Sequence, residues 1–258
     1  MSTPIISFRD FSFQYRAQKR PTLHEINIMP GERILIAGPS GSGKSTLGSC
    51  ICGLIPFSYP GEVKGSLTVD GVNAPKSGIF ELSAHVGTVL QDPDGQFIGL
   101  TVGEDIAFAL ENDCVERQEM HRQVKQTARL VGVEKVLHHA PHEISGGQKQ
   151  RVGLGGVMVG QVDVLLFDEP LANLDPATGK QAVVLIDEIQ KRTGCAVIII
   201  EHRVEDVLYR PVDRVIVMGD GQIRYDGDPD VLLCSTLLQD KGIREPLYVT
   251  ALKYAGVE

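Results

Sequence analysis

A glycine-rich run between an apolar strand and a helical segment has the composition of a phosphate-binding loop. The run follows Ile34–Ala37. Glycines let the backbone curl so that successive N–H groups point at phosphate oxygens, and the N-terminus of the following helix adds the positive end of its dipole. The spacing predicts that Lys44 reaches the β- and γ-phosphates and that the Ser45 hydroxyl binds Mg²⁺. The predicted nucleotide-binding residues are Gly38, Pro39, Ser40, Gly41, Ser42, Gly43, Lys44, Ser45 and Thr46.

A second chemical site lies after another apolar run, Val164–Phe167, which two acids follow. A buried strand of this kind delivers the carboxylates of Asp168 and Glu169 to the C-terminal edge of a sheet, where ligands of open α/β folds bind. We expect Asp168 to hold Mg²⁺, directly or through water, and Glu169 to orient and deprotonate an attacking water. Such pairs also end strands as solvated residues, and the presence of the phosphate loop favours the catalytic interpretation.

A second glycine-rich turn comprises Ser145, Gly146, Gly147 and Gln148. The serine, the exposed glycine N–H groups and the start of the next helix would form another anion-binding terminus. The helix that follows, Gln150–Val157, contains three interior glycines. Each costs about 1 kcal/mol in helix propensity relative to alanine. Close packing against another helix and local fragility are both open explanations.

Taken together, the phosphate loop, the glycine-rich turn and the acidic strand end resemble the motifs of the ATP-binding cassette family. The resemblance covers roughly Ile5 to Gly227. It implies that ATP and Mg²⁺ are the cofactors. It also implies that two such domains pair head to tail, as a homodimer or a heterodimer, with the glycine-rich signature turn of each closing the ATP of the other. A γ-phosphate would then hold the two domains together, and hydrolysis would release them.

The resemblance extends to four more places in the chain. Gln91 matches the glutamine-loop residue, which contacts Mg²⁺ or the attacking water and faces the membrane partner. His202 matches the switch histidine that senses the γ-phosphate, and Tyr15 matches the aromatic residue that stacks on adenine. The segment Ala172-Asn173-Leu174-Asp175 resembles the loop that touches the opposite subunit. The resemblance thus gives Lys44, Gln91, Glu169 and His202 as catalytic residues and Ser45, Gln91 and Asp168 as metal ligands, and it adds Tyr15, Ser145, Gly146, Gly147 and Gln148 to the cofactor-binding set.

Short β-rich runs alternate with helical patterns, which favours an α/β fold with a largely parallel sheet. Helix-spaced charges between Thr101 and Gly132 predict a helical lobe, about residues 92–160, that interrupts the sheet domain. The resemblance implies a P-loop NTPase (RecA-like) core sheet with an antiparallel β subdomain and an inserted α-helical subdomain. We expect residues 1–230 to form the nucleotide-binding domain and residues 231–258 a C-terminal extension or linker. The predicted strands are Ile5–Phe8, Arg33–Ala37, Leu67–Val69, Val86–Leu90, Val164–Phe167, Ala196–Ile200 and Arg214–Val217.

Composition argues against several classes of protein. With 25 basic and 33 acidic residues the net charge is −8, which argues against a nucleic-acid partner. The longest apolar run, Ala196–Ile200, is far below the roughly 18 residues that suggest a membrane span, so another polypeptide would provide any path through a bilayer. Residues Met1–Phe8 show no secretory signal, and five cysteines without metal-type spacing suit a reducing cytoplasm. We expect a peripheral protein at the cytoplasmic face of the cell membrane.

Two segments indicate a subgroup of the family. Gln91–Phe97 with Thr101–Phe108 resembles the ATPases of energy-coupling-factor importers, which serve vitamin and transition-metal uptake. Gly53–Pro56 with Tyr59–Glu62 resembles the first half of tandem ATPases linked to thiamine-precursor uptake. The resemblance implies the ATP-hydrolysing subunit of an importer, whose partners are a second ATPase domain and integral membrane subunits. An exporter ATPase and a soluble cassette protein of DNA repair or translation are the alternatives.

Two further hypotheses concern the surroundings of these motifs. Phe97, Ile98 and Leu100 place apolar side chains near Gln91, and both the core of the helical lobe and a docking groove for membrane subunits are open interpretations. Beyond Leu238 the chain carries no further nucleotide motif. We hypothesise that it is one cassette of a longer two-cassette protein, and a stand-alone subunit with a short extension is the alternative.

Overall fold

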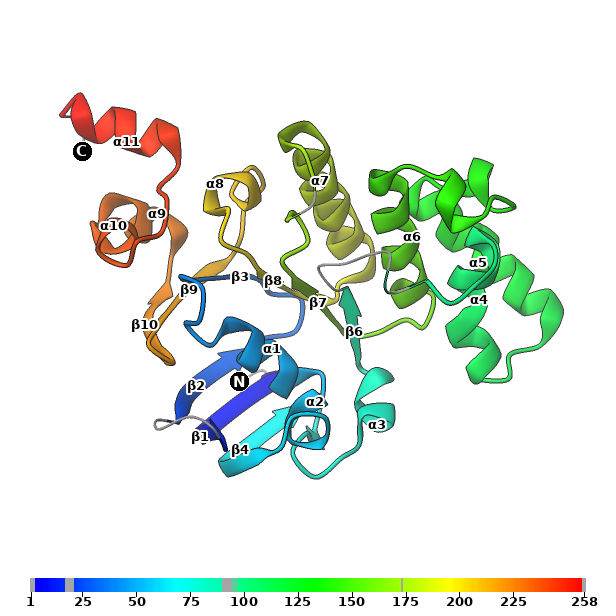
Figure 1. The fold of residues 1–258 in the computed structure, drawn as a ribbon, viewed down its shortest axis with the longest axis horizontal. Coiled ribbons are helices and arrows are strands. Elements are labelled where there is room, and N and C mark those ends of the chain that lie inside the picture. The colour runs from blue at the N-terminus through cyan, green and yellow to red at the C-terminus, as the bar shows by residue number, and fades with distance from the viewer. Residues whose placement is uncertain (1–2, 17–20, 90–94, 96, 173, 257–258) are drawn as a thin grey trace.

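The chain folds into two sheets and a group of helices beside them (Figure 1). The computed structural model describes residues 3–16, 21–89, 95, 97–172 and 174–256. In Figure 1 the six-stranded sheet crosses the centre and the four-stranded sheet lies below it. The helices α4 (Val102–Asn112), α5 (Arg117–Val131) and α6 (Gly146–Met158) form a lobe at the right. This arrangement confirms the predicted α/β fold with an antiparallel subdomain and an inserted helical lobe.

The six-stranded sheet has the order β10-β9-β3-β8-β7-β6, and all of its strands except the edge strand β10 are short and mostly buried. The strands are β3 (Arg33–Ala37), β6 (Val86–Val89), β7 (Val164–Asp168), β8 (Ala196–Ile200), β9 (Arg214–Gly219) and β10 (Gln222–Gly227). All are parallel except β10, which pairs antiparallel with β9. The carboxyl ends of β3, β7 and β8 therefore meet at one edge, so the loops after them lie close together.

Alternation along these strands divides the core between the two faces of the sheet. Leu35, Phe167 and Ile199 belong to a cluster that includes residues of α4, α5, α6 (Gly146–Met158) and α7 (Pro176–Thr193). Ile34 and Ile198 belong to the second cluster, which includes residues of α1 (Lys44–Ile51) and of the antiparallel sheet. The sheet is covered on both faces, which explains why its central strands are continuous apolar runs.

The antiparallel sheet has the order β2-β1-β4-β5. Its strands are β1 (Ile6–Tyr15), β2 (Thr22–Ile28), β4 (Gly61–Val69) and β5 (Val72–Asn73). The predicted bounds Ile5–Phe8 and Leu67–Val69 are too short. In β1 a bulge at Arg9 and Asp10 exposes two successive residues and interrupts the alternation, and the first six residues of β4 are not buried.

The helical lobe begins and ends with clear capping residues. Thr101 caps α4 (Val102–Asn112) through a capping box with Glu104, and Gly132 ends α5 (Arg117–Val131) in a left-handed conformation. These two residues are the bounds between which the sequence predicts helices, so that prediction is confirmed. Shorter helices are α2 (Leu54–Phe57), α3 (Ile79–Ser83) and α8 (Val204–Val207), with 3₁₀ turns at Glu134–Val136 and Pro141–Glu143.

Two of the glycines in α6 face the other helices of the lobe and leave room for a methyl group. A Cβ on Gly155 would lie 3.4 Å from Ile106 and Val131, and a Cβ on Gly156 would lie 3.5 Å from the carbonyl oxygen of Asp105. Both distances are ordinary contacts. Close packing therefore does not require glycine at either position.

Gly156→Ala should stabilise the fold by about 0.5–1 kcal/mol, because the added methyl fits and alanine restricts the unfolded chain. The free energy of unfolding in urea measures this. Gly87→Ala is the control: its Cβ would lie 2.1 Å from Val157, and overpacking of that kind costs roughly 1–3 kcal/mol. Equal losses from both substitutions would mean that α6 has no room for a methyl at position 156.

Three short helices follow β10: α9 (Pro229–Cys234), α10 (Leu237–Asp240) and α11 (Leu247–Tyr254). Leu232 and Leu238 are fully buried in the same cluster as the core sheet. The C-terminal helices therefore share the core of the six-stranded sheet. No helix among the residues that the structure describes is long and apolar enough to cross a membrane.

Candidate nucleotide-binding site

The phosphate loop curls around its own lysine at the end of β3. Lys44 Nζ donates to the carbonyl oxygens of Gly38 and Pro39, at 2.7 and 3.0 Å. Gly43 has a φ of 99°, which favours glycine, and a Cβ on Gly38 would lie 2.5 Å from the carbonyl oxygen of Met218. The loop opens into a cavity of about 540 Å³ whose lining includes residues 40–46 and Glu169.

Two carboxylates face this loop from the end of β7. Asp168 pairs with Ile200 of β8, and the backbone N–H of Glu169 donates to the carbonyl oxygen of Ile200 at 2.8 Å. Glu169 has a φ of 50°, a conformation that non-glycine residues rarely adopt and that often marks functional positions. The structure thus brings the predicted general base and the phosphate loop to one cavity.

The charges of the site are partly desolvated. Burial lowers the pKa of Lys44, and the carboxylates of Glu169, Asp168 and Glu201 oppose that shift. Burial raises the pKa of Asp168, and the charge of Glu169 raises it further, while Lys44 and the Ser45 hydroxyl lower it. Lysine and carboxylates therefore stabilise each other's charged forms.

The residues predicted to hold Mg²⁺ fit a hard cation. Ser45 lies beside Asp168, and Asp168 Oδ1 is buried without a hydrogen-bond partner among the described residues. A carboxylate and a hydroxyl oxygen are the ligands that Mg²⁺ takes together with phosphates and water. Gln91, the third predicted ligand, lies outside the described residues, as does Asn173.

His202 and Tyr15 lie at the borders of the site. The side chain of His202 is 55% exposed, and its Nδ1 lies 2.9 Å from Glu201 Oε1. The Tyr15 hydroxyl lies 3.2 Å from Thr46 Oγ1, and its ring packs edge-on against Phe13. Neither residue is among those that line the phosphate cavity.

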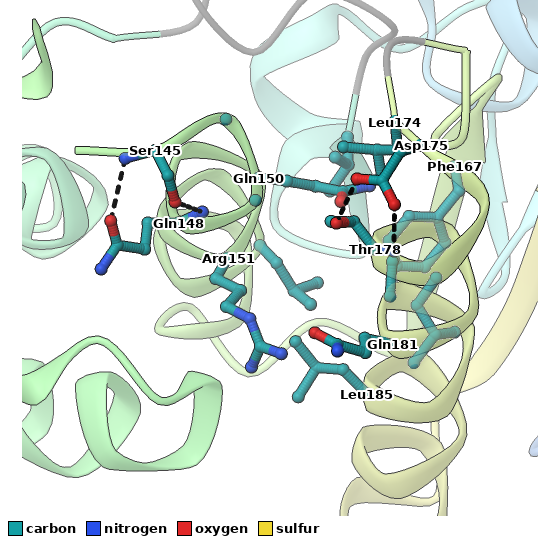
Figure 2. A pocket seen from close by; sticks show the side chains of 16 residues that line it. Ser145, Gln148, Gln150, Arg151, Phe167, Leu174, Asp175, Thr178, Gln181 and Leu185 are labelled. Atoms are coloured by element: carbon teal, nitrogen blue, oxygen red, sulfur yellow. Dashed lines mark hydrogen bonds between the residues drawn. The ribbon is translucent and has the colours of Figure 1, made fainter.

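The signature turn caps a different helix and borders a different cavity. Ser145 Oγ accepts from the backbone N–H of Gln148, and Gln148 Oε1 accepts from the backbone N–H of Ser145 (Figure 2). The turn lies at the edge of a cleft of about 510 Å³ between α6 and α7. No residue of the signature turn lines the phosphate cavity. Within the part of the chain described, the structure keeps the two glycine-rich turns apart.

Three residues without a predicted role connect α6 and the His202 turn to the segment after Glu169. Gln150 Nε2, in α6, donates to the carbonyl oxygen of Pro170 at 2.6 Å. Glu201 and Arg203 flank His202 and reach the segment after Glu169. An acid directly after the apolar run Ala196–Ile200 was the available signal for Glu201, and it resembles the signal that identified Asp168.

Comparison with known proteins identifies the family. Residues 24–172 match the family described as "ABC transporter", and residues 235–258 match one described as "ATP-binding cassette cobalt transporter". The chain belongs to the ABC transporter family. It is an ATPase domain of that family, and ATP is its nucleotide.

The ABC domain has similar proteins of known sequence and structure. It is 57% identical to an ABC transporter ATP-binding protein of Enterococcus faecalis and 56% identical to one of Streptococcus mutans, over 100% and 99% of this chain. In both comparisons it spans 46% of the relative's length. A solved structure, cbiO1 from Clostridium perfringens, part of the ABC transporter complex cbiONQ, superposes with a TM-score of 0.82 at 29% identity, covering 98% of this chain and 100% of that one.

Proposed function

We propose that this ABC domain is the ATP-hydrolysing motor of an energy-coupling-factor type importer, and that it drives transport through separate membrane subunits. One observation carries the proposal: no residue of the signature turn lines the phosphate cavity of the same chain, because the turn borders a different cleft. A complete ATP site then needs the signature turn of a second domain. Binding of ATP becomes a contact between domains, which can do mechanical work on a partner.

Within this proposal each residue of the site has one role. Lys44 and the backbone N–H groups of residues 40–46 bind the phosphates, and Tyr15 stacks on adenine. Ser45, Asp168 and Gln91 hold Mg²⁺, which supplies neutralising charge to the phosphates when bound. Glu169 accepts the proton of the attacking water. His202 binds the γ-phosphate, and Ser145, Gly146, Gly147 and Gln148 bind the γ-phosphate on the opposite domain.

The domain boundary and the pairing are parts of the same proposal. We infer a nucleotide-binding domain over residues 1–230, with the helical lobe at about 92–160 and a C-terminal extension at 231–258. The second ATPase domain, a copy or a relative, lies head to tail with this one. Relatives of about twice the length support the hypothesis of a tandem protein.

Transport subtype and cargo are inferred from similarity. The cobalt-transporter family at residues 235–258 and the likeness to cbiO1 support an importer at the cytoplasmic face of the membrane. Gln91–Phe97 lies mostly outside the described residues, so the similarity of this segment remains a sequence argument. The cargo we propose is a transition-metal ion or a vitamin, bound by another polypeptide.

The apolar residues near Gln91 divide between core and surface. Phe97 packs against the cluster of the helical lobe, while Ile98 and Leu100 are 64% and 81% exposed. Leu100 borders a shallow cavity that Pro141 and Lys149 also line. Leu100 rather than Phe97 is therefore the residue with which to test docking of a membrane subunit, because its substitution leaves the core intact.

Leu100→Asp should weaken retention of the membrane subunits by about 30-fold, the equivalent of the roughly 2 kcal/mol of an interface hot spot. Purification of the tagged protein from detergent-solubilised membranes, with uptake of labelled cobalt or thiamine precursor, measures both steps. Tyr254→Asp is the control, since Tyr254 is 91% exposed on α11. Ribosomes or DNA in place of membrane proteins, or a fully retained complex with Leu100→Asp, would contradict the proposal.

A further inference from the structure

A buried carboxylate separates the strand β8 from the switch histidine. Glu201 is 0% exposed, although it follows the strand directly and its neighbour His202 is exposed. A buried carboxylate is costly unless hydrogen bonds and a partner charge satisfy it. The hydrogen-bond partners of the Glu201 carboxylate therefore indicate which parts of the structure the buried side chain holds in place.

The two oxygens of Glu201 serve two different loops. Oε1 accepts from the backbone N–H of His202 at 2.8 Å and of Arg203 at 3.1 Å, and it lies 2.9 Å from His202 Nδ1. Oε2 accepts from the backbone N–H of Leu171 at 3.2 Å. Leu171 begins the segment 171–175 that follows the general base. One side chain thus joins the histidine turn to Leu171, the residue directly before the loop 172–175 that is expected to touch the opposite domain.

Arg203 adds a second connection between the same two loops. Its Nη1 donates to the carbonyl oxygens of Leu171 and Leu174, at 2.7 and 3.2 Å. Its Nη2 lies 2.6 Å from Asp206 Oδ2, which fixes the guanidinium from the other side. The N–H and the C=O of Leu171 are therefore both held by residues that flank His202.

We propose that Glu201 is a positioning residue for ATP hydrolysis, which holds the His202 ring through Nδ1 and couples its position to the loop at residues 171–175. This inference rests on the proposed function, in which His202 binds the γ-phosphate. With Nδ1 directed to Glu201, Nε2 is the nitrogen available to a phosphate oxygen. A ring that donates from both nitrogens carries a positive charge, and the buried carboxylate balances it. When the opposite domain moves against the segment after Leu171, the contact between Leu171 and Glu201 would shift the His202 ring as well.

Glu201→Gln removes one acceptor oxygen and the negative charge without changing the size of the side chain. An amide has one acceptor oxygen, and its NH₂ group accepts neither from Leu171 nor from Nδ1–H. We expect kcat to fall about 10- to 100-fold, the range known for partners that orient metal-bound histidines. The KM for ATP should stay within about threefold, since the phosphate loop is untouched.

The decisive measurement is the double variant Glu201→Gln with His202→Ala in the full-length protein with its natural partners. If Glu201 acts through His202, the double variant turns over ATP no more slowly than His202→Ala alone. Asp187→Asn is the control, because Asp187 is also buried but pairs with Arg33 and Lys191. The fold loss of ATP turnover caused by Asp187→Asn should multiply with the fold loss caused by His202→Ala.

Nitrogen NMR of labelled histidine gives a readout that does not depend on turnover. The His202 signal, assigned by its loss in His202→Ala, should report a hydrogen-bonded Nδ1–H in the wild type and in Asp187→Asn, but not in Glu201→Gln. An unchanged His202 signal, or multiplying effects in the double variant, would overturn the proposal. Normal turnover of His202→Ala would instead remove the γ-phosphate role proposed above, and the NMR comparison would still decide whether Glu201 holds the ring.

Discussion

Glu169→Gln should lower ATP turnover by about 10²- to 10⁴-fold, the contribution of a positioned general base. The amide keeps the size of the side chain but does not accept a proton from water. Glu169 lines the phosphate cavity together with Lys44 and Ser45. ATP binding should persist because the loop contacts remain. Release of phosphate measures turnover, and a fluorescent ATP analogue measures binding.

Glu32→Gln is the control for this loss of one carboxylate. Glu32 lies before β3, at the end of the sheet opposite the phosphate loop, and accepts from the backbone N–H of Met29 at 2.8 Å. Its substitution should leave turnover unchanged. Near-wild-type turnover of Glu169→Gln in a properly paired protein would remove Glu169 from the role of base.

Ser145→Arg should lower ATP turnover at least about 10²-fold, the loss expected when a preorganised donor to a developing charge is removed. The arginine side chain breaks the capping box and fills the space that the partner's phosphate would take. Binding of ATP to the variant's own phosphate loop should persist, since Ser145 does not line that cavity. Phosphate release and binding of the ATP analogue distinguish the two effects.

Thr101→Arg is the matched control, because Thr101 caps α4 through a capping box of the same kind. Loss of either cap costs about 1 kcal/mol of stability. If Thr101→Arg loses as much turnover as Ser145→Arg, fold stability rather than contact with a phosphate explains the result.

The chemistry of the site could be read from the sequence because it depends on local geometry. A phosphate loop needs glycines at fixed positions beside a lysine, and an apolar strand must precede it. Lys44, Asp168 and Glu169 follow buried strands that continuous apolar residues mark clearly. The parallel order of β3, β8 and β7 then brings them together.

The strands that the sequence analysis missed lack such a signal. β10 has no buried residue, because it lies at the edge of the sheet. β2 contains the polar pair His24 and Glu25 and depends on pairing with β1. The role of Glu201 depends on which backbone groups its oxygens meet after folding. Residue 171 and residue 201 become neighbours only when β7 pairs with β8.

The central claim is that two ABC domains share each ATP site. The measurement that tests it most directly is ATP turnover by an equimolar mixture of Glu169→Gln and Ser145→Arg copies of this 258-residue domain, at concentrations at which wild-type copies pair with one another and turn over ATP. Each variant alone lacks one element in both sites of a pair. A mixed pair has one site with both an intact Glu169 and an intact Ser145, so the mixture should recover about a quarter of wild-type turnover if pairing is random. A mixture no more active than the separate variants, at concentrations at which the wild-type domain is active, would contradict the account.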